Sequence, residues 1–381
     1  MKLPVRAGIL GGGQLAKMLA ISAYGLGVKP LIFAASKNDC ALDAVAEFVI
    51  DDGTLGALKN FLAKCDLAVI ENEFIDLLRL KNALGKTPLF PSLDCLEMVQ
   101  NKLHQKTYLQ KFGIPTLDFI PIKNMNDYDR CVQNLGPSLV FKREKMGFDG
   151  RGNFVCERFN KKKFLKTNSF FTGYAEPFVD FKIELAVVGA VSINGEISVF
   201  PTIETVQKDG QCHFAIVPAD ISEIKSKNAQ EIAIDVMKRF GATGVFAVEM
   251  FYLRDGRLVV NEIAPRVHNS GHLTMNGFGI SQFELHWRAV LGMSLPKKAL
   301  LPKSPSLAMV NIIGKRKIKT VRNEAFNFSK PGRKLRGDFW IHWYGKWGGT
   351  FNRKLGHINC TGISVKQTLK TAQRIRNRIK I

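Results

Sequence analysis

A glycine-rich turn near the amino terminus most strongly constrains the fold of this chain. The apolar run Ala7–Leu10 leads into Gly11-Gly12-Gly13, and Gln14–Ala23 follows with the spacing of a helix. A buried strand that turns through glycines into a helix is typical of a parallel α/β sheet. Pro30–Ala34 and Leu67–Ile70 are further short apolar runs. The first hundred residues are therefore expected to form a βαβ-type parallel sheet.

The same turn has more than one functional interpretation. Gly11, Gly13 and Ala16 have the spacing at which backbone N–H groups at a helix N-terminus can bind a phosphate. A dinucleotide site would need a carboxylate after the second strand, but Phe33 is followed by Ala-Ala-Ser. NAD binding is thus disfavoured. Binding of a phosphate or substrate, or a tight strand–helix turn alone, both remain open.

Length and composition indicate a multidomain globular protein. A chain of 381 residues is too long for one core, and 46% apolar with 23% charged residues is ordinary for a soluble protein. No apolar run is long enough for a membrane helix, and Gln14 and Lys17 interrupt the stretch that resembles a signal peptide. Seven scattered cysteines without a Cys-x-x-Cys pair fit a reducing cytoplasm and disfavour a zinc site.

Positive charge is concentrated at the carboxyl end. The net charge is +22, and residues 301–381 hold 19 basic and 2 acidic side chains, a net charge of +17. Pro296, Pro302 and Pro305 indicate a linker before this region. Such a region suggests anionic partners, either nucleic acid or phosphorylated small molecules, although a generally basic surface explains it equally well.

A second glycine-rich segment follows an apolar strand that ends in a lysine. Val140-Phe141-Lys142 precedes residues 143–152, where Gly147, Gly150 and Gly152 alternate with cations. Backbone donors and cations in such a loop can surround a polyphosphate. The segment lacks the Gly-Lys-Ser/Thr of a Walker A loop, and a solvent-exposed hairpin turn remains an equal alternative.

Two glutamates in a predicted hairpin indicate a cation site. Asp255-Gly256 separates two apolar runs, which predicts a two-residue turn and places Glu249 directly opposite Glu262. A divalent cation would remove the repulsion between them, and magnesium is usually held by carboxylates together with substrate phosphates. Asn261 offers a neutral oxygen beside the pair. The alternative is that both glutamates face solvent and pair with lysines.

A polar loop follows this hairpin. Residues 264–272 bring together Arg266, His268, Asn269 and His272. Such a run suits the wall of an active site better than a core. Either histidine alone would more often be a structural hydrogen-bonding group, but the neighbouring arginine and asparagine favour a functional loop.

Together these motifs resemble the ATP-grasp superfamily and, within it, the N5-carboxyaminoimidazole ribonucleotide synthetases of purine biosynthesis. The resemblance runs almost from end to end of the chain. It rests on residues 8–15, 100–102 with Lys106, 147–152, Glu176 with Glu184, 261–266, 268–272, and 344–346 with Arg353, Lys354, Gly356 and His357.

The resemblance implies a mixed α/β (α+β) fold of three parts. A Rossmann-like, or pre-ATP-grasp, domain would span residues 1–100. The ATP-grasp domain would span residues 101–300, with a mobile lid subdomain at about 115–180. A small, β-rich and basic C-terminal domain would span residues 301–381. The resemblance also implies a homodimer.

ATP and a magnesium or manganese ion would lie between the two ATP-grasp subdomains. Lys102 and Lys142 would contact the phosphates, Glu184 would bind the ribose hydroxyls, and Glu249 and Glu262 would hold the metal. The adenine hinge would be Glu176, Pro177, Phe178 and Val179. The remaining nucleotide contacts would come from Gly147, Phe148, Asp149, Gly150, Arg151, Gly152, Asn153, Gln207, Asn261 and Glu262.

In the implied reaction, bicarbonate attacks the γ-phosphate of ATP to give carboxyphosphate and ADP. The exocyclic amine of aminoimidazole ribonucleotide then captures the carbon dioxide that carboxyphosphate releases. The catalytic residues would be Asp149, Arg151, Arg266, His268 and Lys346. Lys346 and Arg353 would grip the 5′-phosphate of the ribonucleotide. The other substrate contacts would come from Gln14, Glu73, Asn269 and Ser270.

The chain departs from the family pattern at several positions. Phe148 stands where the lid usually has tyrosine, Gln207 where a histidine is common, and Leu273 where a tryptophan is usual. Ala16-Lys17 replaces Gly-Arg, and the segment from Lys346 to Arg353 is one residue longer than usual. With these departures we expect a divergent but active enzyme, and a slow or repurposed enzyme stays open as the alternative.

Other functions stay open beside this interpretation. Formate-dependent glycinamide ribonucleotide formyltransferase is the closest rival, and the motifs at 344–346 and 353–357 disfavour it. Tryptophans at 340, 343 and 347 among cations keep nucleic-acid binding as an alternative, although not as the expected main role. A dehydrogenase is the weakest rival, and no membrane partner is expected.

Overall fold

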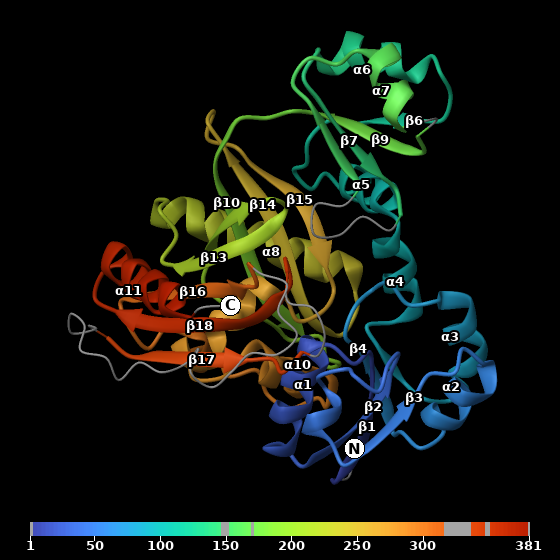
Figure 1. The fold of residues 1–381 in the computed structure, drawn as a ribbon, viewed down its shortest axis with the longest axis vertical. Helices are drawn as coiled ribbons and strands as arrows, with labels where there is room; N and C mark the ends of the chain where they lie inside the picture. The colour runs from blue at the N-terminus through green and yellow to red at the C-terminus, as the bar shows by residue number, and fades with distance from the viewer. Residues whose placement is uncertain (1–2, 146–151, 169–170, 316–336, 347–350, 380–381) are drawn as a thin grey trace.

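The structure, a computed structural model, describes residues 3–145, 152–168, 171–315, 337–346 and 351–379. Three β-sheets with flanking helices make up this part of the chain (Figure 1). No helix among the described residues is both long and apolar enough to cross a membrane. The mixed α/β architecture agrees with the sequence-based expectation.

The amino-terminal sheet has five parallel strands in the order β3-β2-β1-β4-β5. This confirms the predicted parallel sheet, and the helix after the glycine turn runs one residue beyond its predicted end. The elements are β1 (Val5–Leu10), α1 (Gln14–Tyr24), β2 (Val28–Ala34), η1 (Leu42–Ala44), β3 (Glu47–Ile50), α2 (Leu55–Leu62), β4 (Leu67–Ile70), α3 (Leu77–Ala83) and β5 (Leu89–Phe90).

The connection to the next sheet corrects one prediction. The spacing of apolar residues suggests one helix over 96–112, but the chain forms α4 (Leu93–Gln100) and α5 (Lys102–Lys111). Asn101 separates them because its side-chain oxygen accepts hydrogen bonds from the N–H groups of Leu103 and His104. An asparagine in this role begins a new helix instead of continuing the old one.

A smaller antiparallel sheet of four strands, in the order β6-β9-β7-β8, lies at the top of the molecule in Figure 1. Helices α6 and α7 lie beside it, and a cluster of aromatic side chains around Phe141 and Phe164 fills its core. The elements are β6 (Ile120–Ile122), α6 (Asp127–Leu135), β7 (Leu139–Arg143), β8 (Asn153–Cys156), α7 (Lys161–Asn168) and β9 (Gly173–Pro177).

The largest sheet has nine antiparallel strands, and its carboxyl-terminal strands continue it without a break. Strand β13 pairs with β16 at the junction, so residues on both sides of the predicted boundary near 300 share one sheet. The three domain boundaries themselves stay a prediction. The strands are β10 (Phe181–Val191), β11 (Ile197–Val199), β12 (Ile203–Lys208), β13 (Gln211–Val217), β14 (Gly244–Leu253), β15 (Leu258–Ala264), β16 (Ser306–Ile313), β17 (Phe339–Trp343) and β18 (Lys354–Gly362).

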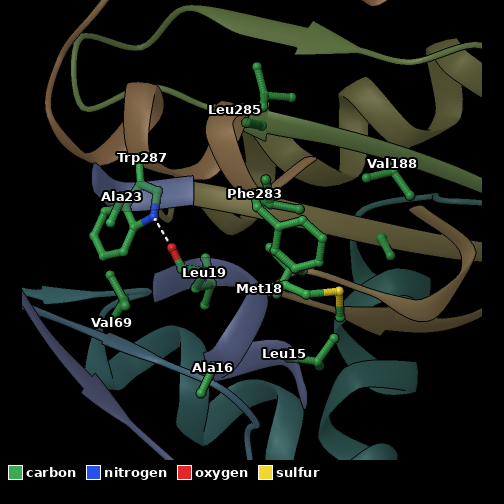
Figure 2. Close-up of a cluster of buried hydrophobic side chains, with 14 of the residues drawn as sticks. Leu15, Ala16, Met18, Leu19, Ala23, Val69, Val188, Phe283, Leu285 and Trp287 are labelled. Atoms are coloured by element: carbon green, nitrogen blue, oxygen red, sulfur yellow. Dashed lines mark hydrogen bonds between the residues drawn. The ribbon is translucent and has the colours of Figure 1, made fainter. Parts of the chain in front are cut away.

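Helices cover both faces of the large sheet and join it to the amino-terminal sheet. The apolar face of α1 packs against α10, where the indole nitrogen of Trp287 donates to the carbonyl oxygen of Leu19 at 2.9 Å (Figure 2). This buried contact fixes α1 against the large sheet. The helices are α8 (Glu223–Phe240), η2 (Asn269–Leu273), α9 (Thr274–Gly277), α10 (Gln282–Val290), η3 (Lys297–Leu300) and α11 (Val365–Arg378).

Candidate active site

A cavity of about 910 Å³ lies where the three sheets meet. It is lined by residues of the amino-terminal sheet, the small sheet and the large sheet. Many of the sequence-predicted site residues line it: Gln14, Glu73, Lys102, Lys142, Asn153, Glu176, Pro177, Phe178, Val179, Glu184, Gln207, Glu249, Asn261, Glu262, Arg266, His268 and Asn269.

The opposed glutamates are present, but by a different route from the predicted one. The turn holds three residues, 254–256, because the N–H of Leu253 donates to the carbonyl of Arg257. This shift alone would place Glu249 opposite Asn261. A β-bulge at Asn261 restores the register, so Glu249 does pair with Glu262. The extra residue also turns Asn261 toward the cavity, as bulges near sites often do.

Burial and the repulsion between the two glutamates raise the pKa of Glu249 more than the nearby cations lower it. Burial raises the pKa of Glu249 to about 8, and the charges of Glu262 and Glu184 add to the effect. Burial also raises the pKa of Glu184 to about 7, and one of its oxygens has no hydrogen-bond partner among the described residues. Lys102 approaches Glu262 at 3.0 Å. Carboxylates with raised pKa values facing one cavity are suited to hold a cation.

The donor set fits magnesium shared with phosphates better than a cation enclosed by protein alone. The described residues contain no group of three or more histidine, cysteine or acidic side chains placed to bind one metal ion. Two opposed carboxylates and a nearby amide oxygen are what the protein contributes to a magnesium site completed by phosphate and water. Glu249, Glu262 and Asn261 supply these oxygens.

A buried cluster of two lysines around Glu176 forms the next part of the cavity wall. Lys142 lies 2.6 Å from one carboxylate oxygen of Glu176 and donates to the side-chain oxygen of Asn261 at 2.9 Å. Lys106 contacts the other oxygen of Glu176. Burial alone would raise the pKa of Glu176, but the two ammonium groups outweigh burial and lower it. The cluster fixes Lys142 at the edge of the cavity.

Lys106 is a residue to which the sequence assigned no role. It lies one helical turn after Lys102 in α5, so the two lysines share a face, but Lys106 is fully buried and does not line the cavity. Burial lowers its pKa although Glu176 favours the charged form. The four-residue spacing of Lys102 and Lys106 could have indicated from the sequence that the two lysines lie on the same face of a helix.

Arg266 and Glu73 form a bidentate pair across two domains. The guanidinium donates to both carboxylate oxygens, with Nη2 3.0 Å from Oε1. Burial would raise the pKa of Glu73, but Arg266 outweighs it and the pKa is lowered. Glu73 was predicted to touch the ribonucleotide, and here both side chains line the cavity while they bind each other.

His268 is neutral and is held by its own loop. Burial lowers its pKa to about 3, and Arg266 and Lys354 add to the effect. Its Nδ1 lies 3.4 Å from the backbone nitrogen of Ser270, and its Nε2 lies 3.5 Å from an oxygen of Glu249. Gln282 accepts from the N–H of His268 at 2.8 Å and donates to its carbonyl at 2.7 Å.

Ser270 and Asn269 differ in their access to the cavity. Ser270 is buried and does not line the cavity, so the prediction that it contacts substrate directly does not fit. Its hydroxyl lies 2.9 Å from the imidazole of His268. Asn269 does line the cavity, and its amide exchanges hydrogen bonds with Asn311 of β16.

Two N–H groups of the glycine turn are already bonded to a carboxylate of the protein. Glu71, at the end of β4, accepts from the N–H groups of Gly13 at 2.7 Å and Leu15 at 3.2 Å. A Cβ on Gly11 would lie 2.6 Å from the side chain of Glu71, so the glycine makes room for this carboxylate. These bonds favour a structural role for the turn, and binding of a phosphate or substrate by its remaining N–H groups stays a prediction. The carboxyl ends of neighbouring parallel strands lie at the same edge of a sheet. The position of Glu71 directly after the strand Leu67–Ile70 could therefore have indicated that it lies near the glycine turn.

The carboxyl-terminal site residues lie beside this turn. Lys346 is close enough to Glu71 for the carboxylate to favour its charged form, but burial dominates and lowers the pKa of Lys346 to about 8. Lys17 of α1 donates to the carbonyl of Tyr344 at 3.0 Å and so holds the segment that carries Lys346. Arg353 is exposed and does not line the cavity, whereas the adjacent Lys354 does.

Part of the predicted lid lies outside the described residues. These positions are Gly147, Phe148, Asp149, Gly150 and Arg151. The described end of the segment begins at Gly152, which has a positive φ of 81° and accepts from the N–H of Arg143 at 3.0 Å. Asn153 then lines the cavity as the first residue of β8.

Three family models match successive parts of the chain. Residues 5–100 match the ribonucleotide synthetase preATP-grasp domain, and residues 107–283 match the ATP-grasp domain. Residues 308–371 match the phosphoribosylaminoimidazole carboxylase C-terminal domain.

Curated relatives and solved structures agree with these matches. N5-carboxyaminoimidazole ribonucleotide synthase of Bacillus subtilis is 34% identical, over 92% of this chain and 90% of the relative. Phosphoribosylaminoimidazole carboxylase of Candida glabrata is also 34% identical, over 96% of this chain but 65% of its own length. The chain thus spans about two thirds of the fungal relatives it matches.

The solved N5-carboxyaminoimidazole synthase of Aspergillus clavatus, in complex with ADP and 5-aminoimidazole ribonucleotide, superimposes with a TM-score of 0.85. The two proteins are 30% identical, and the match covers 98% of each chain. On the evidence of fold, site and relatives, this chain belongs to the N5-carboxyaminoimidazole ribonucleotide synthase family of ATP-grasp enzymes.

Proposed function

We propose that this chain uses ATP and bicarbonate to carboxylate 5-aminoimidazole ribonucleotide to N5-carboxyaminoimidazole ribonucleotide in purine biosynthesis. The observation that carries the proposal is one cavity lined by two lysines, a pair of opposed carboxylates and an arginine. Membership of the family and the ADP and ribonucleotide complex of the Aspergillus clavatus relative support it.

The nucleotide end of the cavity is built on Lys102, Lys142 and the segment Glu176–Val179. The two ammonium groups would neutralise ATP phosphates, and the segment would receive the adenine. Glu184, which has one oxygen without a hydrogen-bond partner among the described residues, would accept hydrogen bonds from the ribose hydroxyls. Asn153, Gln207 and the lid residues 147–152 would complete this end.

Glu249 and Glu262, with Asn261 beside them, would hold magnesium. Bound there, the ion would neutralise charge on the transferring phosphate, where manganese could serve as well. Lys142 keeps its place without the nucleotide because Glu176 and Asn261 already hold it. A cation positioned in advance needs no reorganisation when charge develops on the phosphate.

Arg266 and His268 would line the pocket for bicarbonate and carboxyphosphate, with Asp149 and Arg151 of the lid. Since His268 is neutral, Arg266 is the permanent positive charge at this point. The neutral imidazole carries one N–H and would act as a hydrogen-bonding group beside Glu249 and Ser270. A lid that closes over the pocket would keep carbon dioxide from escaping before the amine captures it.

The ribonucleotide end would use Gln14, Glu73, Asn269, Lys346 and Arg353. Lys346 and Arg353 would bind the 5′-phosphate, and Lys354 joins them because it lines the cavity. Ser270 would act through His268 and not by direct contact.

The quaternary structure and cellular location are proposed on less direct grounds. We propose a homodimer by analogy with the family. All seven cysteines are free thiols, which supports a reducing compartment such as the cytoplasm. The fungal relatives are longer than this chain, so any further activity of theirs is not transferred to it.

The test measures ADP release from ATP, magnesium and bicarbonate with and without 5-aminoimidazole ribonucleotide, and detects the carboxylated product directly. Ribonucleotide-stimulated ADP release with one carboxylated product per ADP is expected. Stimulation by glycinamide ribonucleotide and formate instead would establish the formyltransferase alternative. No turnover by folded protein with any of these substrates would refute the proposal.

A further inference from the structure

Helix α11 carries a stripe of positive charge that the proposed reaction does not use. Lys366, Lys370 and Arg374 are exposed and four residues apart, so they lie on one face of the helix, and Arg378 continues the spacing. The helix contains five basic and no acidic residues. In the described part of the chain, none of these four side chains forms an ion pair.

Another surface helix of the same protein balances its charge. Helix α8 contains four basic and three acidic residues. Lys227 pairs with Glu223 at 2.8 Å, and Arg239 pairs with Asp235 at 3.0 Å. Mixed signs at i, i+4 are sufficient for a solvated helix face. Solubility alone therefore does not explain why all the charged residues of α11 are positive.

The stripe faces away from the reaction site. The opposite side of α11 buries Ala372 and Ile375 against β16 and β18, in a core that includes Val310 and Ile358. His357 precedes Ile358 in β18, and neighbouring residues of a strand point to opposite faces of a sheet. The ring of His357 therefore lies on the other face, 4.8 Å from the ring of His272 in η2. The sheet thus separates the stripe from the loop that carries His268 and Asn269.

We propose that the outer face of α11 binds the phosphate backbone of a nucleic acid, a function separate from the proposed carboxylation. Four residues of helix advance about 6 Å, so the cations form a regular row along the surface. Lysine and arginine rows of this kind contact phosphates without reading bases. An isoelectric point of about 9.7 strengthens the attraction over a longer range.

The composition of the face favours nucleic acid over a protein or a membrane. No large apolar side chain within α11 is exposed, since those of the helix pack toward the sheet. Protein interfaces have an apolar or aromatic centre in which lysine is depleted. Helices that lie on membranes insert apolar side chains beside their cations. A row of cations alone matches a phosphate backbone.

The experiment measures binding of a fluorescent 20-base-pair DNA duplex to the full chain by anisotropy at several salt concentrations. The triple variant Lys366→Gln, Lys370→Gln, Arg374→Gln should weaken binding ~10-fold or more at low salt. It should also make the slope of log affinity against log salt shallower by about 2–3. The control variant Lys59→Gln, Lys227→Gln, Lys238→Gln removes the same charge from exposed sites elsewhere and should change the affinity far less.

Both variants should keep the melting temperature and the ribonucleotide-stimulated ADP release of the unmodified chain. If the triple variant fails to fold, Lys370→Glu alone provides the same comparison against Lys227→Glu. Equal weakening by the α11 and control variants would overturn the proposal, because diffuse charge would then explain the binding. It would also be overturned if the duplex did not bind at protein concentrations up to ~100 μM, or if polyglutamate bound through α11 and the duplex did not.

Discussion

The two walls of the cavity differ in whether their carboxylates have partners within the protein. On the amino-terminal wall, Glu71 accepts hydrogen bonds from the backbone of the glycine turn, and Glu73 pairs with Arg266. The protein itself thus provides a hydrogen-bond or ion-pair partner for each of these two carboxylates, although burial still raises the pKa of Glu71. A ligand that enters the cavity finds this wall already compensated.

On the wall formed by the large sheet, called the uncompensated wall below, Lys102 lies 3.0 Å from Glu262, but Glu184 and Glu249 have no cationic partner in an ion pair among the described residues. Glu184 has a buried oxygen without a described partner, and Glu249 faces Glu262 across the hairpin. Natural cores avoid like charges and unpaired polar groups of this kind unless a function requires them. The contrast supports the proposed site for a cation and a nucleotide on this wall, and it predicts that loss of a carboxylate has different effects on the two walls.

Removal of a carboxylate from the uncompensated wall should have the largest effect on turnover. Glu249→Gln is expected to lower the ADP release rate at saturating magnesium by about 10²–10³-fold, because a charge that offsets the cation is lost. Without magnesium the melting temperature should stay equal or rise, since the substitution removes repulsion. Glu223→Gln on the exposed face of α8 is the matched control. Normal turnover of the Glu249 variant would contradict the metal assignment.

Removal of a carboxylate from the compensated wall should instead destabilise the fold. Glu73→Ala leaves the buried guanidinium of Arg266 without its partner, which is expected to cost about 3–5 kcal/mol of unfolding free energy. Urea denaturation of this variant beside Glu249→Gln measures the contrast directly. Equal losses of stability in the two variants would show that the walls do not differ as described.

The pH dependence of stability should distinguish the walls further. Folding raises the pKa of Glu249 from about 4.5 to about 8, so the folded state binds the extra proton between these values. Stability contributed by that bound proton is present at low pH and is lost as pH rises toward 8. Buried histidines, whose pKa values are lowered, act in the opposite direction below about 6.5.

The window from pH 6.5 to 8 lies above the range of the histidines, and the comparison with Glu249→Gln separates Glu249 from Glu184 and Lys346, whose pKa values of about 7 and about 8 lie in the same window. Metal-free protein is expected to lose stability across this window, and Glu249→Gln should lose much less, as measured by chemical denaturation at half-unit intervals. Magnesium with ATP should flatten the curve of the unmodified protein, because a cation favours the ionised carboxylate. Identical slopes for the two proteins would disprove the raised pKa of Glu249.

The sequence predicts the uncompensated wall better than the compensated one, because the residues that pair on the first wall are close in sequence and those on the second are far apart. Glu249 and Glu262 belong to one hairpin, where local spacing decides the pairing. Even so, the prediction missed both the longer turn and the bulge at Asn261, and it succeeded because the two shifts cancel. Bulges depend on tertiary contacts that a local pattern does not contain.

The compensated wall depends on contacts between distant segments. Glu71 reaches the turn at Gly13 only because β1 and β4 are neighbours, and Glu73 meets a residue 193 positions away. The sequence predicts the turn and the parallel sheet but not which carboxylate occupies the helix N-terminus. The sequence includes Lys106 in the family motif but does not predict its partner, for the same reason, since Glu176 lies on a different sheet element. Local patterns predicted elements and motifs, whereas the partners of buried charges required the assembled fold.

The smallest expected effect concerns how the compensated wall positions Lys346. Lys17 is largely buried and donates to the carbonyl of Tyr344, two residues before Lys346. Lys17→Met removes this bond, and the KM for the ribonucleotide is expected to rise about 10-fold, because a hydrogen bond from a charged group contributes about 1.5–3 kcal/mol. The KM for ATP should stay within twofold, since Lys17 does not line the cavity wall that faces the nucleotide residues.

Lys17→Arg should restore much of the ribonucleotide affinity, because a guanidinium can also donate to the carbonyl. Lys29→Met, at an exposed position of β2, is the matched control and should leave both KM values unchanged. An equal rise in the KM for ATP would mean that Lys17 supports the whole junction of α1 and the large sheet, in which case the compensated wall would be a structural support without a specific part in substrate binding.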